Sequence, residues 1–255
     1  MGGCNKTLNV LVACEESQRV CLAFLKLGHN AFSCDIQEPS GNRPDRHIKG
    51  DVLEVLNPKD HLGDFEAPDQ YISFKTMDGS YHEVEKWDLI VAFPPCTHLA
   101  VSGARHFEKK RADGRQREGI ELFCKILNAD CDKICVENPV NIISGDYVKR
   151  WFPELVEKYG LPISPTQTIQ PYEYGHPSRK KTCLWLKGLP TLVPTKIVEP
   201  KIKEYICKNG KIARFSDDYG SGDKTAGTRR SKTYEGIAEA MAVQWSNAIE
   251  KEEVK

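Results

Sequence analysis

Several features that would narrow the function at once are missing from this 255-residue sequence. Lysine and arginine together number 36, the same as aspartate and glutamate, so the net charge indicates neither a nucleic-acid nor a membrane partner. No apolar run approaches the length of a transmembrane helix, and no charged and apolar leader opens the chain. We therefore expect a soluble protein of the cytoplasm, with one hydrophobic core and any binding signal confined to a local stretch.

Paired Cys-x-x-Cys motifs, which typically hold zinc, are also missing, although the chain has ten cysteines. Most of these cysteines lie among aliphatic residues, where a thiol behaves as a small buried hydrophobe. We expect this of Cys4, Cys14, Cys21, Cys34, Cys124, Cys131, Cys135, Cys183 and Cys207, and we expect no metal site. Cys96 has different surroundings and is considered separately.

A third missing feature is the Gly-x-Gly-x-x-Gly loop that cradles a dinucleotide after the first strand of many α/β proteins. The chain nevertheless opens with a strand over 8–14, a helix over 17–27 with Ser17 as its N-cap, and a strand over 31–34. Asp35 follows the second strand and Asp51 follows a polar loop. These aspartates could merely cap the next elements, but the βαβ pattern favours a nucleoside-like cofactor without a pyrophosphate, with Asp35 on its ribose.

The stretch from Leu89 to Cys96 carries the strongest chemical signal. Residues 89–93 are apolar and predict a buried parallel strand, which Pro94 and Pro95 end because neither can donate a ladder hydrogen bond. Cys96 then lies just beyond the carboxyl end of a strand, the edge where open α/β sheets bind ligands. We interpret Cys96 as a nucleophile.

A second strand brings a carboxyl group to the same edge. Residues 133–136 predict a buried strand that ends at Glu137-Asn138-Pro139. Because consecutive parallel strands end at one edge of a sheet, the thiol of Cys96 and the carboxyl group of Glu137 are expected to share a crevice.

The remaining segments predict further elements around this crevice. We expect a β-hairpin over 71–84 in a surface insertion, a helix over 145–160, another strand ending near Leu186, a possible hairpin around Asn209-Gly210, and an amphipathic helix over 236–245. A basic run between Arg105 and Arg117 is either a solvated helix face or a loop that closes on a polyanion beside Cys96.

Together these motifs resemble the cytosine-C5 DNA methyltransferase family, especially its compact phage-type members. Phe93-Pro94-Pro95-Cys96 resembles that family's nucleophile motif, Val136-Glu137-Asn138 its Glu-Asn-Val motif, and residues 174–180 its Gly-x-Pro-Gln-x-Arg-x-Arg segment. The motifs also follow one another in the family's order. The family's Phe-x-Gly-x-Gly loop is replaced by Cys14-Glu15-Glu16-Ser17-Gln18, and Thr97 stands where the family usually has Gln.

The resemblance implies a fold and a division into regions. The fold is an α/β, single Rossmann-like, class I S-adenosylmethionine-dependent methyltransferase domain, with a mostly parallel sheet and helices on both faces. Residues 1–187 would form the core, with the hairpin insertion at 62–86. Residues 188–228 would form a short target-recognition segment, and residues 229–255 a C-terminal helix returning to the core. The expected partner is DNA with a flipped cytosine, bound by a monomer in the cytoplasm, the host cell's if the protein is phage-encoded.

The resemblance also implies roles for single residues. Cys96 would attack cytosine C6, Glu137 would protonate or hydrogen-bond N3, Asn138 would hold the turn, and Arg179 or Lys180 would contact the base O2 or a phosphate. The methyl donor, S-adenosylmethionine, would be held by residues at the strand ends: Glu15, Glu16, Ser17, Asp35, Ile36, Asp51, Val52 and Pro94.

Three other readings remain open. The same residues could methylate C5 of a pyrimidine in single-stranded nucleic acid, RNA or a free nucleotide, because the recognition segment has only about forty residues. The protein could also bind the donor or DNA without catalysis, as the altered first loop allows. A cysteine hydrolase using His98 or His106 as its base is a third reading, but nothing in the sequence indicates an acyl pocket.

Overall fold

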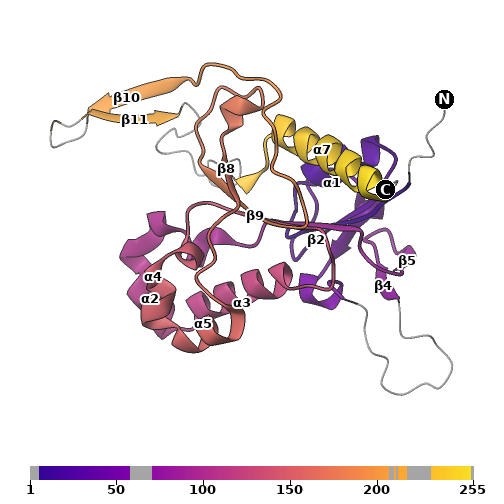
Figure 1. Cartoon of the computed structure of the whole chain (residues 1–255), viewed down its shortest axis with the longest axis horizontal. Coiled ribbons are helices and arrows are strands. Elements are labelled where there is room, and N and C mark those ends of the chain that lie inside the picture. The colour runs from indigo at the N-terminus through magenta and orange to yellow at the C-terminus, as the bar shows by residue number, and fades with distance from the viewer. Residues whose placement is uncertain (1–5, 58–70, 207–209, 211, 217–230, 254–255) are drawn as a thin grey trace.

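The computed structural model in Figure 1 describes residues 6–57, 71–206, 210, 212–216 and 231–253. A central seven-stranded sheet is flanked by helices, as expected for an α/β protein. Its strands, in spatial order, are β3 (His47–Lys49), β2 (Asn30–Asp35), β1 (Asn9–Ala13), β6 (Leu89–Ala92), β7 (Ile134–Asn138), β9 (Thr182–Lys187) and β8 (Gln167–Ile169).

The directions of the strands confirm the expectation of a mostly parallel sheet. The five strands from β3 to β7 are all parallel, and they follow the doubly wound order in which the chain first builds outward from β1 and then returns to its other side. β9 runs antiparallel to both β7 and β8. The sheet is therefore compatible with a Rossmann-like fold, with one reversed strand near its edge.

Helices cover both faces of the sheet, as the apolar strands require. α1 (Arg19–Lys26) and α7 (Glu235–Glu253) lie on one face, while α2 (Phe107–Ala112), α3 (Arg115–Leu127), α4 (Asp146–Trp151) and α5 (Pro153–Tyr159) lie on the other (Figure 1). Alternate side chains of β1 contribute to two separate apolar cores, Val10 with Trp245 on one face and Leu11 with Phe123 on the other. Short 3-10 helices complete the fold: η1 (Pro44–Arg46), η2 (Val52–Glu54), η3 (Cys96–His98), η4 (Val101–His106), η5 (Ile142–Ser144) and η6 (Pro171–Glu173).

The single helix expected over 145–160 is wrong, because two helices occupy this stretch. α4 ends at Trp151, and Pro153 begins α5. Phe152 between them has φ −140° and ψ 54°, which is not helical. A proline disfavours the helical conformation of the residue before it, so the break lies where the sequence contains Phe152-Pro153.

The hairpin expected over 71–84 is present, but its described part is not a surface addition. β4 (Ile72–Lys75) pairs with β5 (Tyr81–Val84), and the inner side chains of both strands join the main core. The ring of Phe74 lies 4.9 Å from that of Phe32 and 5.7 Å from that of Trp87. The hairpin therefore covers the outer part of the sheet. Residues 62–70 of the expected insertion lie outside the described residues.

Residues beyond the sheet include a second hairpin and the long C-terminal helix. β10 (Ile202–Ile206) pairs with β11 (Ile212–Ser216) and extends from the body in Figure 1, while Asn209 of the expected turn lies outside the described residues. α7 extends well beyond the expected 236–245, to Glu253. Within the described ranges, none of the helices is long and apolar enough to cross a membrane.

The start of α7 is in close contact with the segment that precedes β9. A Cβ atom added at Gly236 would lie 1.9 Å from the backbone oxygen of Tyr174. The neighbouring Tyr234 hydroxyl donates a hydrogen bond to Ser178, and the Gly236 amide donates one to Nε2 of His176. Gly236 therefore lets α7 lie directly against residues 174–178.

Replacing Gly236 tests this contact. We expect Gly236→Ala to lower the free energy of unfolding by about 1–3 kcal/mol, because the tyrosine carbonyl or the whole helix must move. Gly145→Ala is the matched control, since a Cβ at Gly145 would meet no atom within 4 Å. Urea denaturation of both variants gives the comparison, and equal midpoints for the two would contradict the packing described.

Candidate active site at the carboxyl edge of β6 and β7

The edge where β1, β6 and β7 end is the expected position for a ligand. After β1 the chain adds β2 and β3 on one side, and β6 returns to the other side of β1. This change of direction is a topological switch point, and open α/β sheets bind ligands in the crevice beside it. Both predicted reactive residues lie at this edge: Cys96 follows β6, and Glu137 lies near the end of β7.

Cys96 is held on a short and well-fixed turn. Pro94 is buried, and Cys96 is the first residue of η3. The backbone amides of Leu99 and Ala100 both donate hydrogen bonds to the backbone oxygen of Cys96, at 3.0 and 2.9 Å. The thiol is only partly exposed. The turn therefore presents Cys96 beyond the strand end, as the two prolines suggested.

Asn138 joins the turn to the neighbouring strand. This fully buried side chain donates from Nδ2 to the backbone oxygen of Pro94 at 2.8 Å. Its Oδ1 accepts a hydrogen bond from Asn141 Nδ2 at 3.1 Å. Because a buried amide left without partners costs about 1–3 kcal/mol, this arrangement fixes β7 against the cysteine turn. The structure places Asn138 in the position expected for a residue that holds the turn.

The reversed strand β9 adds a third group to the edge. In its pairing with β7, Glu137 lies opposite Leu184 and Asn138 opposite Cys183. Since β9 is antiparallel, its first residue lies at the edge where the parallel strands end. Lys180, two residues before β9, is thereby brought beside Glu137, and Arg179 next to it is exposed.

The charges of these groups act on one another. Burial raises the pKa of the Cys96 thiol, the Glu137 carboxylate raises it further, and the positive charges of Lys180 and Lys110 oppose the rise. Burial also raises the pKa of Glu137, against the opposing charge of Lys180. Burial thus favours the neutral form of both the thiol and the carboxyl group, and Lys180 opposes this effect on each of them.

A second group of side chains lies at the ends of β1 and β2. Cys14 adopts a positive φ of 57°, and its thiol pKa is raised to about 12, first by burial and then by Asp35 and Asp51. The two aspartates are therefore close to one point beyond β1. Asp35 accepts the Gln37 amide through Oδ1, and Ile36 beside it is 74% exposed. An exposed isoleucine next to carboxylate oxygens suits a ligand that has both a flat ring and hydroxyl groups.

Asp51 and Val52 have different positions. The Asp51 carboxylate accepts the Leu53 amide at 3.0 Å and caps η2, so the capping role considered from the sequence is present. Asp51 is nevertheless exposed, and like Asp35 it raises the pKa of the Cys14 thiol. Val52 is buried in the core.

The loop after β1 uses its acidic residue to begin α1. The buried Glu15 carboxylate accepts hydrogen bonds from the backbone amides of Val20, at 2.7 Å, and Cys21, at 3.2 Å. The expectation that Ser17 caps the helix is wrong: Ser17 donates to Glu15 instead, at 3.4 Å. Glu16 is partly buried and lies 3.7 Å from Lys232. The sequence did not identify this cap, because the carboxylate reaches the helix across a turn in which Gln18 has φ 56°.

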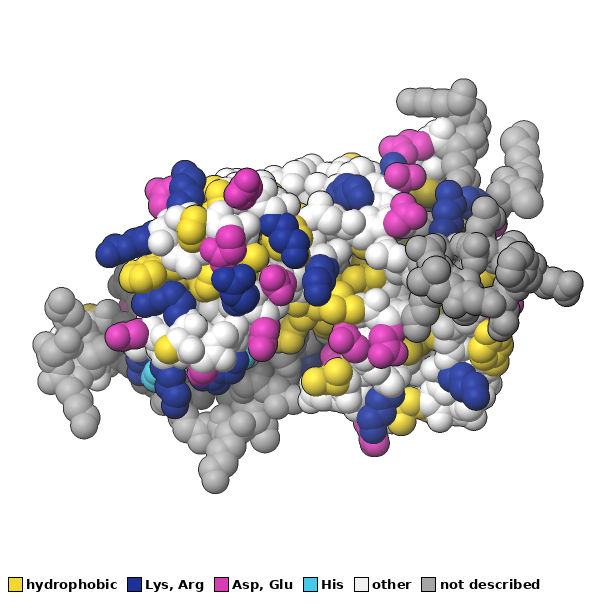
Figure 2. Space-filling view, turned by 90° about the horizontal axis from the view of Figure 1, so that it is seen from below, with side chains coloured by type: hydrophobic (Ala, Val, Ile, Leu, Met, Phe, Trp, Pro, Cys, Tyr) yellow, Lys and Arg dark blue, Asp and Glu magenta, His cyan; other side chains and the backbone are white. Residues whose placement is uncertain are grey.

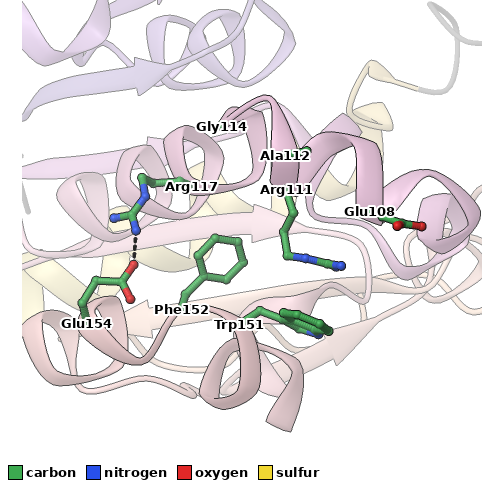
Figure 3. A pocket seen from close by; sticks show the side chains of 8 residues that line it. All are labelled: Glu108, Arg111, Ala112, Gly114, Arg117, Trp151, Phe152 and Glu154. Atoms are coloured by element: carbon green, nitrogen blue, oxygen red, sulfur yellow. Dashed lines mark hydrogen bonds and ion pairs between the residues drawn. The ribbon is translucent and has the colours of Figure 1, made fainter.

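The basic run from Arg105 to Arg117 does not form one cationic surface. Arg115 pairs with Asp113, Arg117 pairs with Glu154, and the Arg111 guanidinium lies 3.8 Å over the Trp151 ring. Figure 2 shows basic and acidic side chains interspersed on the helical face seen from below. A pocket of about 440 Å3 is lined by residues of α2, α3, α4 and α5, and none of the predicted site residues lines it. Its side chains are drawn in Figure 3.

Most of the other described cysteines lie in the core. Cys14 is only partly buried, and six others are buried, as expected of small hydrophobes: Cys21, Cys34, Cys124, Cys131, Cys135 and Cys183. Cys4 and Cys207 lie outside the described residues. Within the part of the chain that the structure describes, no group of three His, Cys, Asp or Glu side chains is arranged to hold a metal ion.

The buried Glu15 gives a pH-dependent prediction. Burial raises its folded-state pKa to about 7 from an ordinary 4.5, although the two amides oppose the rise. Because the unfolded chain releases this proton at lower pH than the folded chain, the contribution of Glu15 to stability should decline between pH 4.5 and 7. As the pH rises through this interval, the free energy of unfolding of the parent protein should therefore fall relative to that of Glu15→Gln. Urea denaturation at several pH values measures the difference, and a constant difference would contradict the assignment.

No protein-family model matches the chain, and the comparison with curated proteins finds no significant match. Any activity has to be inferred from the side chains at the β6–β7 edge and at the ends of β1 and β2.

Proposed function

We propose that this protein transfers a methyl group from S-adenosylmethionine to C5 of cytosine in DNA, through a covalent bond between Cys96 and C6. One observation carries the proposal. Cys96, Glu137 and Lys180 come from three separate segments, and the two strand ends and the reversed β9 bring them to one edge. Nucleophilic attack on a pyrimidine needs a thiolate and an acid that acts on the ring, and a nearby cation favours the thiolate.

The reaction requires the thiol because C5 of cytosine is a poor nucleophile. Attack of the Cys96 thiolate forms a sulfur–C6 bond and moves the electrons of the C5–C6 double bond toward C5. C5 would then bond to the methyl carbon of the donor while the methyl–sulfur bond breaks, which leaves the donor as a neutral thioether. Transfer of the C5 proton to a base such as water restores the double bond and expels the Cys96 thiolate. The turn held by Asn138 keeps the sulfur in place during both steps.

Glu137 is suited to act at N3 of the base. Burial raises its pKa, so it retains a proton closer to neutral pH than an exposed glutamate would. A protonated carboxyl group can donate to N3 as the ring accepts electrons from sulfur. The positive charge of Lys180 acts on both Cys96 and Glu137, and it would favour the thiolate and any negative charge on the base or a phosphate.

The residues at the ends of β1 and β2 fit a nucleoside donor without a phosphate chain. Asp35 would bind ribose hydroxyls through its carboxylate, and the exposed Ile36 would contact the adenine, with Asp51 nearby. S-adenosylmethionine held there would supply an electrophilic methyl group. Glu15 would act on the donor through the loop that it holds, because its buried carboxylate accepts hydrogen bonds from two helix amides.

A smaller substrate is the main alternative, and one observation favours it. In the described part of residues 188–228, the regular structure beyond the core is the single hairpin of β10 and β11. A hairpin offers less surface for reading duplex sequence than an ordinary recognition domain. Methylation of single-stranded nucleic acid, RNA or a free nucleotide would use the same Cys96 and Glu137.

The covalent step can be tested with DNA that contains 5-fluorocytosine. The fluorine replaces the C5 proton whose loss releases the enzyme, so the methylated adduct should persist on Cys96. We expect a protein–DNA band on a denaturing gel that requires S-adenosylmethionine, and peptide mass spectrometry should locate the link at Cys96.

Three comparisons make this result specific. Cys96→Ser should remove the adduct, while Glu137→Gln should slow its formation by about 10²–10⁴-fold, the range typical of a lost general acid. Arg179→Ala removes an exposed arginine and keeps Lys180, so it distinguishes a contact between Arg179 and the base from the role of Lys180. Absence of an adduct in the parent protein would favour a binding protein, and an adduct formed only with a fluorinated nucleotide would favour the smaller substrate.

A further inference from the structure

Lys110 is a buried cation directly behind the cysteine turn. It lies on α2, only 9% of its surface is exposed, and its Nζ donates to the backbone oxygen of Thr97 at 2.5 Å. Thr97 is the residue after Cys96. A Cβ atom at Gly103 would lie 3.4 Å from the same Nζ, so the chain of η4 passes closely over the ammonium group.

Burial of a lysine without a carboxylate partner is unusual, because removal of an ammonium ion from water costs free energy unless it is paired. In the described part of the chain, Lys110 forms no ion pair, and its assigned partner is a neutral carbonyl oxygen. Several arginines nearby do have acidic partners, such as Asp113 and Glu154. The Lys110 charge is therefore left to act on the cysteine turn.

We propose that Lys110 is a positioning residue for Cys96: its ammonium group fixes the Thr97 carbonyl and places positive charge behind the thiol, which favours the thiolate. The inference rests on the proposed function, in which Cys96 must lose its proton to attack the base. Lys110 does this through the turn and contacts neither the base nor the donor.

Three charged groups surround Cys96, and their effects on its pKa have different signs. After burial, which raises the pKa most, Glu137 on β7 raises it further, whereas Lys180 before β9 and Lys110 on α2 lower it. Lys180 also faces Glu137, whose carboxylate offsets part of its charge. Lys110 acts from the opposite element, α2, so its contribution remains when Lys180 is engaged by Glu137 or by a substrate.

A neutral contact of similar geometry lies next to Lys110 and provides the control. Gln116 on α3 is fully buried, and its Nε2 donates to the backbone oxygen of His98 at 3.2 Å. Consecutive carbonyls of the turn are thus held by a charged donor and by an uncharged one. Loss of either contact loosens the turn, but only loss of Lys110 removes charge.

The test is the pH dependence of alkylation of Cys96 by iodoacetamide, followed by mass spectrometry of the peptide that contains it. We expect Lys110→Met to move the midpoint upward by roughly half a pH unit, so that alkylation at a fixed lower pH slows about threefold. Lys110→Arg should retain the parent midpoint, because it keeps the charge. Gln116→Leu should change the rate of methyl transfer without moving the midpoint.

Two outcomes would overturn the inference. An unchanged midpoint in folded Lys110→Met, or in Lys110→Gln if the methionine variant does not fold, would show that the charge does not act on the thiol. An equal shift in Gln116→Leu would show that looseness of the turn, and not charge, is responsible. Alkylation needs neither DNA nor donor, so failure of the fluorocytosine experiment with a normal Lys110 shift would count against the proposed reaction alone.

Discussion

The pairing of β6 with β7 is the constraint on which the candidate site depends. Ala92 lies opposite Val136, so the residues that follow each strand leave the sheet side by side. Asn138 then joins the two ends by donating to the Pro94 carbonyl from a buried position. A displacement of one residue in this register would separate Cys96 from Glu137 and leave a buried amide without its partner. The same contacts therefore stabilise the fold and align the reactive groups.

At this edge, burial and positive charge have opposite effects on the pKa values of two partly buried groups. Burial favours the neutral forms of both Cys96 and Glu137, and two lysines oppose that tendency from different sides. Lys180 reaches the edge because β9 runs backward, and Lys110 reaches it because α2 packs behind the turn. Asp35 at the end of β2 and Asp51 after β3 lie along the same edge, where the proposed donor would bind.

Local sequence patterns were sufficient for the parallel core and for the meeting of Cys96 with Glu137. Apolar runs ended by prolines or acids locate strands and their termini, and parallel strands share an edge by geometry. The direction of β9 was not predictable in this way, because it depends on pairing with β7 far away in the chain. Burial of Lys110 and capping by Glu15 were missed for a similar reason: a charged residue in a polar stretch looks exposed until its distant neighbours are known. The break at Phe152-Pro153 was also missed, although the proline itself indicates it.

The most direct measurement of the central claim is the methylation state of cytosine in DNA from cells that express the protein. Sequencing that distinguishes 5-methylcytosine should detect the modified base with the parent protein, and not with Cys96→Ser at the same level of expression. The positions of the modified bases would also show whether a surface as small as the β10–β11 hairpin selects a sequence. The same unmodified DNA in both cultures would contradict the proposal that Cys96 and Glu137 together methylate cytosine in DNA.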